Sequence, residues 1–268
     1  MEIANVWQIL FYRSCALTVF LFIVVTFKSN KKPLVAIRKS GLAAIVGGLS
    51  LVFAFSGGIF AIQSTSVANA MFLFASAPFI AAFLGWFLLK ETVGARTWTA
   101  MAFAVLGIAI MVGEGVSIGK GAGNLAAIIS AVGFASFTVA LRWGKVNDMM
   151  PTVLIAGIFA IMCSALICIF RGYSLAIPLN DLVISIILGF FQVGLGLSLY
   201  TLGSKSVPAV QAALLSMTEV ILGPFWVWLF LGETPLFYTI LGGTILMLAL
   251  IGNAVSSWTT SSVNAIRF

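Results

Sequence analysis

The sequence predicts an all-α membrane protein, a bundle of nine transmembrane helices built from two inverted structural repeats of four and five helices. Of its 268 residues, 62% are hydrophobic and only 8% are charged, whereas about a quarter of the residues of a soluble domain carry charge. The apolar residues fall in runs of about 20, the length at which a helix crosses a hydrocarbon core of ~30 Å. Two stretches about 140 residues apart also resemble each other.

Nine apolar runs, bounded by charged residues, Gly, Pro and Asn, are the predicted spans. They are Val6–Phe27, Gly41–Ile62, Ala68–Leu89, Thr97–Val112, Leu125–Leu141, Thr152–Phe170, Leu182–Leu202, Ala209–Leu231 and Pro235–Val255. Several connections are so short that the neighbouring helices must be antiparallel, which predicts a compact bundle. A membrane β-barrel is disfavoured, because its strands would alternate apolar and polar residues and these runs are apolar on all sides.

The basic residues predict the orientation of the spans, because Lys and Arg accumulate in cytoplasmic loops. Only Lys120 and Arg171 follow even-numbered spans, and Arg13 lies inside a span. The others follow odd-numbered spans and fall on one side: Lys28, Lys31, Lys32, Arg38, Lys39, Lys90, Arg96, Arg142, Lys145, Lys205 and Arg267. The short N-terminus is therefore expected outside, and the tail of residues 256–268 in the cytoplasm.

The composition disfavours most enzyme chemistries. His is absent, the seven Asp and Glu are scattered, and the three Cys lie inside apolar runs without zinc or redox spacing. No P-loop is present, so any pumping must be secondary. We therefore expect no catalysis, no cofactor, no metal and no nucleic-acid partner. Two alternatives are a membrane-embedded enzyme on lipid or isoprenoid substrates, which lacks a cluster of acids, and a channel, which lacks a ring of like polar groups.

The internal repeat pairs SVANAMFLFASAPFIAAFLGWFLLKE, Ser66–Glu91, with SVPAVQAALLSMTEVILGPFWVWLFLGE, Ser206–Glu233. The predicted topology places Glu91 on the cytoplasmic side and Glu233 on the outer side, so the two copies are inverted. Inverted repeats that meet at the midplane are typical of secondary transporters. We expect a first half over residues 1–113, lacking its first helix, and a second half over residues 124–255.

These motifs resemble the drug/metabolite transporter superfamily, EamA-domain type. The resemblance rests on LLKET at Leu88–Thr92, FLGET at Phe230–Thr234, WQILFYR at Trp7–Arg13, and the Gly-rich last helix of each half. It covers essentially the whole chain. It implies ten helices in two inverted halves, both termini cytoplasmic, and export or exchange of small metabolites, with amino acids as common substrates. This chain departs from that pattern by lacking the first helix.

The expected function is a secondary transporter of the bacterial inner membrane, an exporter or exchanger of a small metabolite such as an amino acid. It would work by alternating access around a midplane cavity. The expected partners are that substrate, membrane lipids, and protons as a candidate coupling ion. Both a monomer and a homodimer are compatible with the sequence.

Two charged residues inside predicted spans are the strongest site candidates. Glu219 lies about ten residues into its span, where insertion of a charged side chain costs ~2.5–3.5 kcal/mol. It is predicted to contact a substrate amine or to couple protons, or alternatively to be a neutral acid that hydrogen bonds between helices. Arg13 lies about two turns below the outer end of its span. It could pair with Glu219, hold the other end of a zwitterion, or snorkel to the outer headgroups.

Weaker candidates follow from helical spacing. Asn69, Phe72 and Ser76 form one stripe in the third span, and Gln211, Glu219 and Trp226 form another in the eighth. Both stripes are predicted to line the cavity, with ordinary packing or interhelical hydrogen bonding as the alternative. The lesser candidates of the same kind are Gln192, Tyr200 and Ser56.

Three further features have structural interpretations. Pro78 and Pro224 are predicted to kink their spans. Glu91 precedes a Thr at the entry to the next helix, where its carboxylate is expected to offset the N-terminal helix dipole.

Overall fold

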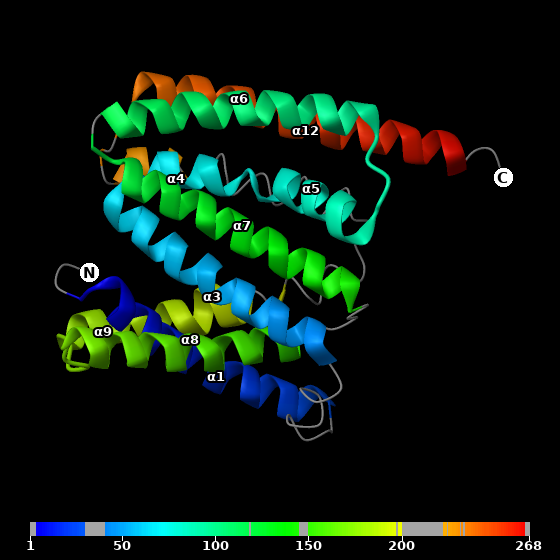
Figure 1. The fold of residues 1–268 in the computed structure, drawn as a ribbon. Coiled ribbons are helices and arrows are strands. Elements are labelled where there is room, and N and C mark those ends of the chain that lie inside the picture. Colours follow the sequence, from blue (N-terminus) through cyan, green and yellow to red (C-terminus); the bar gives the residue numbers. More distant parts are fainter. Residues whose placement is uncertain are drawn as a thin grey trace. The chain divides into compact units, whose positions relative to one another are not determined.

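The structure, a computed structural model, describes residues 4–29, 41–117, 119–144, 150–196, 198–199, 222–223, 225–230, 232 and 234–265 (Figure 1). Within these ranges every regular element is helical. Seven candidate spans there are long and apolar enough to cross a membrane, and Leu179–Leu195 is a shorter apolar helix. The predicted all-α class of membrane-length helices is confirmed. Most of the predicted span Ala209–Leu231 lies outside the described residues.

The helices form two compact units, and neither unit is one half of the sequence. Unit 1 comprises residues 1–59 and 136–205, and unit 2 comprises residues 60–135 and 206–268. The boundaries fall inside helix α3, Gly41–Ser64, and helix α7, Gly121–Trp143, so both helices contribute to both units.

Unit 1 is organised around helix α1, Val6–Ser29. It packs against helix α8, Met150–Arg171, helix α9, Leu179–Ile187, and the π-helix η1, Leu188–Leu195. Leucines from three helices, among them Leu17, Leu51 and Leu154, form a buried core with Phe137. Close approach depends on small residues, as is usual between membrane helices: Gly157 of α8 lies against the Thr18 hydroxyl of α1.

Unit 2 contains helices α4, Val67–Phe74, α5, Ala77–Leu89, α6, Ala95–Ser117, and α12, Phe237–Ala265, with the first part of α7. Helices α6 and α12 lie side by side (Figure 1). They touch backbone to backbone: a Cβ added to Gly107 would lie 2.6 Å from the carbonyl oxygen of Gly242. Ala104 and Leu246 are fully enclosed in the core beside this crossing.

The third predicted span is broken rather than continuous. Helix α4 ends at Phe74 and α5 begins at Ala77, with Pro78 in the first turn of α5. Proline has no N–H to donate, so it suits a first turn and interrupts a longer helix. The predicted distortion at Pro78 is confirmed, while Pro224 lies outside the described residues. Both pieces together still form one apolar segment, Val67–Leu89, of membrane-spanning length.

The seventh predicted span begins as an α-helix and continues as a π-helix. Helix α9 ends at Ile187, and η1 follows directly over Leu188–Leu195. Gly189 of η1 lies against the backbone carbonyl of Arg13. A Cβ added to Gly194 would lie 2.7 Å from the Phe20 ring. π-Turns inside helices occur frequently at functional sites, and here the two glycines let η1 press closely on α1.

Candidate functional site

Arg13 is held inside unit 1 by an aromatic ring. Its guanidinium carbon lies 5.0 Å from the centroid of the Phe55 ring on α3, a cation–π geometry. The side chain is half-buried, and no acidic side chain among the described residues forms an ion pair with it. A guanidinium that stacks on a ring keeps its five N–H donors in one plane, free to engage a planar carboxylate in two parallel hydrogen bonds.

The N-terminal half of α1 is fixed to the segment between α8 and α9. Gln8 donates to the Ser174 carbonyl and the Tyr12 hydroxyl donates to the Leu175 carbonyl, both at 2.5 Å. The Ala4 amide donates to the Asp181 carboxylate at 3.0 Å. These bonds restrain α1 on one side of Arg13, while η1 packs on the Arg13 carbonyl. Arg13 therefore lies in a part of α1 whose backbone is held by contacts on both sides along the helix.

The other candidates of unit 1 have no comparable setting. The Ser56 hydroxyl donates to the Val52 carbonyl of its own helix at 2.8 Å, and the side chain is half-buried. Gln192 lies on η1 and is exposed on unit 1. In contrast, the buried hydroxyls of Ser14 and Thr152 have no hydrogen-bond partner within the described part of the chain. Buried polar groups are normally paired, so these two hydroxyls are exceptions within unit 1.

In unit 2, Asn69 belongs to a buried polar cluster. The side-chain amide nitrogen of Asn69 donates to the side-chain oxygen of Asn124. The Thr65 hydroxyl donates to the same oxygen at 2.9 Å. Asn124 in turn donates to the Met111 carbonyl at 3.4 Å. The cluster ties the start of α4 to α6 and α7. The side-chain oxygen of Asn69 is buried and accepts no hydrogen bond in the described region, so the cluster retains one unused acceptor.

The remaining candidates of unit 2 are packed or exposed. The Ser76 hydroxyl donates to the Leu73 carbonyl at 2.6 Å, where α4 ends. Phe72 packs against Gly243 of α12 and between two core clusters, which favours its structural interpretation. Trp226 is exposed and stacks on Phe230 with ring centroids 5.6 Å apart. Glu219, Gln211 and Tyr200 lie outside the described residues.

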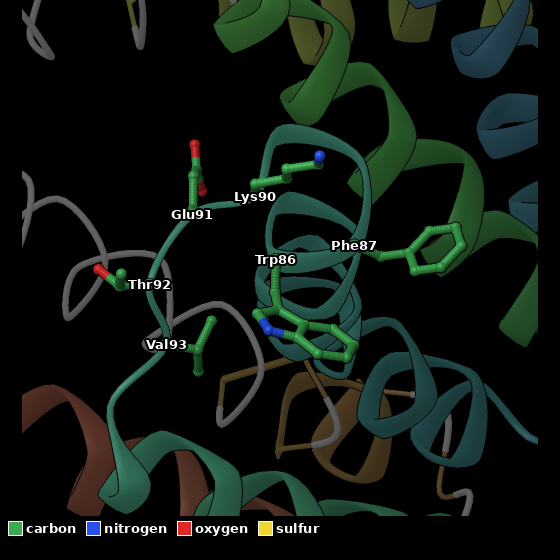
Figure 2. A pocket seen from close by; sticks show the side chains of 6 residues that line it. All are labelled: Trp86, Phe87, Lys90, Glu91, Thr92 and Val93. Atoms are coloured by element: carbon green, nitrogen blue, oxygen red, sulfur yellow. The ribbon is translucent and has the colours of Figure 1, made fainter.

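An open surface pocket of about 490 Å³ lies at the end of α5 (Figure 2). Trp86 and Phe87 line it from the last turns of the helix. Lys90, Glu91, Thr92 and Val93 line it from the connection to α6. The predicted dipole role of Glu91 was wrong, because α6 begins only at Ala95 and its first turn holds no acidic residue. The amide of Glu91 instead donates to the Gly85 carbonyl at 3.2 Å and closes the end of α5.

Sequence reasoning missed several residues of these clusters. Phe55 carries no polar signal, and only the packing of α3 on α1 makes it the partner of Arg13. Asn124 and Thr65 lie near helix ends, where polar residues are common for capping reasons alone. The sequence does show that Thr65, Asn69 and Asn124 lie in or beside long apolar runs, where polar side chains are unusual. It does not show that these three side chains bond to one another, because that depends on the fold.

Comparison with known proteins identifies the family. The model of the EamA-like transporter family matches residues 1–113 and residues 121–255, which confirms the two-repeat architecture. No curated protein matches the chain. A solved structure, described only as a crystal structure of a protein, has a similar fold with a TM-score of 0.64 and 16% identity. The match covers 97% of this chain and 90% of the other. The chain belongs to the EamA-like transporter family, and is thereby a membrane transporter of small molecules.

Proposed function

We propose that the protein is a secondary transporter that exports or exchanges a small zwitterionic metabolite, such as an amino acid, by alternating access. The observation that carries this proposal is the setting of Arg13, a guanidinium inside an apolar helix that stacks on Phe55 without an acidic partner in the described residues. A charge in a membrane span is expensive and usually serves a ligand or ion pathway.

Arg13 suits the carboxylate of such a substrate. A carboxylate accepts two parallel hydrogen bonds from a guanidinium, and this pairing is strong where water is excluded. The braces on α1 at Gln8 and Tyr12, together with the contact of η1, keep the donors oriented before the substrate arrives. Preorganisation of this kind lowers the entropy that binding must remove.

Glu219 is proposed as a separate charged contact for the substrate ammonium or for a proton. An acid about halfway through its predicted span can contact the substrate ammonium when ionised, or carry a proton when neutral. If the substrate and a proton compete for the Glu219 carboxylate, export of the substrate is coupled to the proton gradient. Asn69, with one unused acceptor, is proposed as a further contact for a substrate N–H.

The proposed setting is the bacterial inner membrane, with the tail of residues 256–268 in the cytoplasm, as the distribution of Lys and Arg indicates. Residues 1–113 and 124–255 are proposed as the two inverted halves, which rock around a midplane cavity during transport.

A competition experiment in proteoliposomes tests the proposal. Vesicles loaded with candidate amino acids are assayed for exchange of a radiolabelled amino acid. The first competitor is the same amino acid without label. The next three competitors keep its side chain but are its amide, its decarboxylated amine and the acid that lacks the amino group. We expect competition to require both the carboxylate and the amine.

The variant Arg13→Gln should abolish this exchange, and Arg171→Gln should not. Arg171 is a suitable control because it is an exposed basic residue at the end of α8 in the same unit. Equal exchange by wild type and Arg13→Gln, or a transported substrate without an anionic group, would contradict the proposal.

A further inference from the structure

Arg13 brings a positive charge into the apolar part of unit 1. It lies about two turns from the start of α1 at Val6. A charge in such surroundings needs a compensating group, because it has given up part of its hydration. A carboxylate is the usual compensating group, but none among the described residues pairs with this guanidinium. The ring of Phe55 takes its place, with the ring centroid 5.0 Å from the guanidinium carbon.

The Phe55 ring is fixed in position by its neighbours. It packs against two buried clusters that both draw residues from α1, α3 and α8. Leu10 belongs to one cluster and Leu17 to the other, and both leucines are almost fully enclosed. They lie three residues before and four residues after Arg13, so all three share one face of α1. A ring held in this way orients the longer and more flexible arginine side chain that lies over it.

A ring and an acid act differently on a guanidinium. An acid in the place of Phe55 would form two parallel hydrogen bonds with Arg13, so it would neutralise the charge and occupy the donors. The face of a ring attracts the cation through its quadrupole, but it leaves the net charge in place. It also holds the side chain back from the headgroups, which a free arginine could reach by snorkelling. The charge and the donors of Arg13 therefore stay available to an anion.

We propose that Phe55 is a positioning residue that acts through Arg13 and makes this site specific for a ligand with one planar anionic group, a carboxylate. The inference rests on the proposed function, because it takes Arg13 as the contact for the substrate carboxylate. Without the ring, the guanidinium rotates freely, and substrate binding must immobilise it. Loss of the ring should therefore raise the KM of exchange and leave the maximal rate unchanged.

The test measures the KM and the maximal rate of amino-acid exchange in proteoliposomes of the full-length protein. Phe55→Leu removes the ring, and Phe55→Tyr keeps it. Monofluoro, difluoro and trifluoro phenylalanine at position 55 withdraw electrons from the ring face and nearly preserve its shape, so they weaken the cation–π attraction with little change in packing. Phe53→Leu is the matched control, because Phe53 lies on the same helix and is 60% exposed.

We expect Phe55→Leu to raise the KM about 5- to 30-fold, the range that corresponds to a cation–π contact. Phe55→Tyr and Phe53→Leu should keep the wild-type KM. The fluorinated series should raise the KM stepwise, while the unfolding temperature and the maximal rate stay at their wild-type values. A KM that does not change along the fluorinated series would overturn the proposal, as would an equal rise of the KM in Phe53→Leu.

NMR of protein that carries isotope-labelled arginine detects the ring contact without transport. The Nε–H signal of Arg13 is assigned by its loss in Arg13→Gln. The ring current should shift this signal in wild type and Phe55→Tyr, whereas in Phe55→Leu it should lie near the signal of the exposed Arg171. An Arg13 signal that is the same in wild type and Phe55→Leu would also overturn the proposal.

The exchange assay separates two kinds of failure. If Arg13→Gln abolishes exchange and every Phe55 variant keeps the wild-type KM, the positioning role of Phe55 is wrong and the proposed function stands. If Arg13→Gln exchanges substrate like wild type, the proposed function is wrong, and the specificity role of Phe55 is wrong with it.

Discussion

The backbone contact between α6 and α12 makes a sharp prediction about stability. A methyl group added by Gly107→Ala would lie 2.6 Å from the Gly242 carbonyl oxygen, about 0.8 Å inside the 3.4 Å at which ordinary contact begins. The obstacle is backbone on a packed helix, so no side chain can rotate away, and the helices must move apart. Overpacking of this kind costs about 1–3 kcal/mol. Gly242→Ala meets the Gly107 carbonyl at 2.5 Å and should cost a similar amount.

The same two helices supply matched controls. Gly113 of α6 and Gly252 of α12 have nothing within 4 Å of an added Cβ. Gly113→Ala and Gly252→Ala should therefore leave stability unchanged or raise it slightly, because alanine favours helix more than glycine. The measurement is unfolding of the purified protein in mixed detergent micelles, with helicity followed by circular dichroism. The double variant Gly107→Ala/Gly242→Ala should lose less free energy of unfolding than the two single variants lose together. A single displacement of the two helices relieves both contacts. Equal stability of Gly107→Ala and Gly113→Ala would refute the close crossing.

Three further predictions concern η1, the asparagine cluster and the topology. Gly189→Ala should push α1 away at Arg13 and reduce substrate exchange, whereas Gly196→Ala, whose nearest neighbour is 4.0 Å away, should not; equal exchange would contradict the packing of η1. Asn124→Leu should lower the free energy of unfolding by about 1–3 kcal/mol, because it removes the acceptor of the buried Asn69 amide and of the half-buried Thr65 hydroxyl; micellar unfolding checks this, and an unchanged midpoint would argue against the cluster. Single cysteines placed in residues 28–40 and 256–268 of a cysteine-free protein should react with an impermeant reagent only after permeabilisation, and labelling of intact cells would overturn the proposed orientation.

The helices were predictable because hydropathy reports burial in lipid directly. The predicted span Val6–Phe27 matches the candidate membrane span found in α1, and the predicted start of α3 at Gly41 is also its start in the structure. The break before Pro78 was predictable because proline carries its own local signal. The π-helix Leu188–Leu195 was not, because a change from i→i−4 to i→i−5 hydrogen bonding leaves apolar composition unchanged and depends on how Gly189 packs.

The site was predictable where a residue type conflicts with its surroundings. Arg13 stands out because a charge interrupts an apolar run, and no knowledge of the fold is needed to notice it. Its partner Phe55 is one of 23 phenylalanines, so only the packing singles it out. The dipole role of Glu91 failed because the chain is not helical from Glu91 to Gly94, so three residues separate this carboxylate from the first residue of α6, Ala95.

The central claim is that Glu219, an acid about halfway through its predicted span, binds the substrate or the proton that drives its transport. The most direct measurement is the pH dependence of amino-acid exchange in proteoliposomes by wild type and Glu219→Gln. Glutamine keeps the shape and hydrogen bonding of the acid but cannot titrate, and the repeat-equivalent region around Ala77 has no acid to replace it. The account predicts that Glu219→Gln unfolds at the wild-type temperature, exchanges substrate much more slowly and shows no pH dependence. Wild-type exchange with an unchanged pH profile would contradict it.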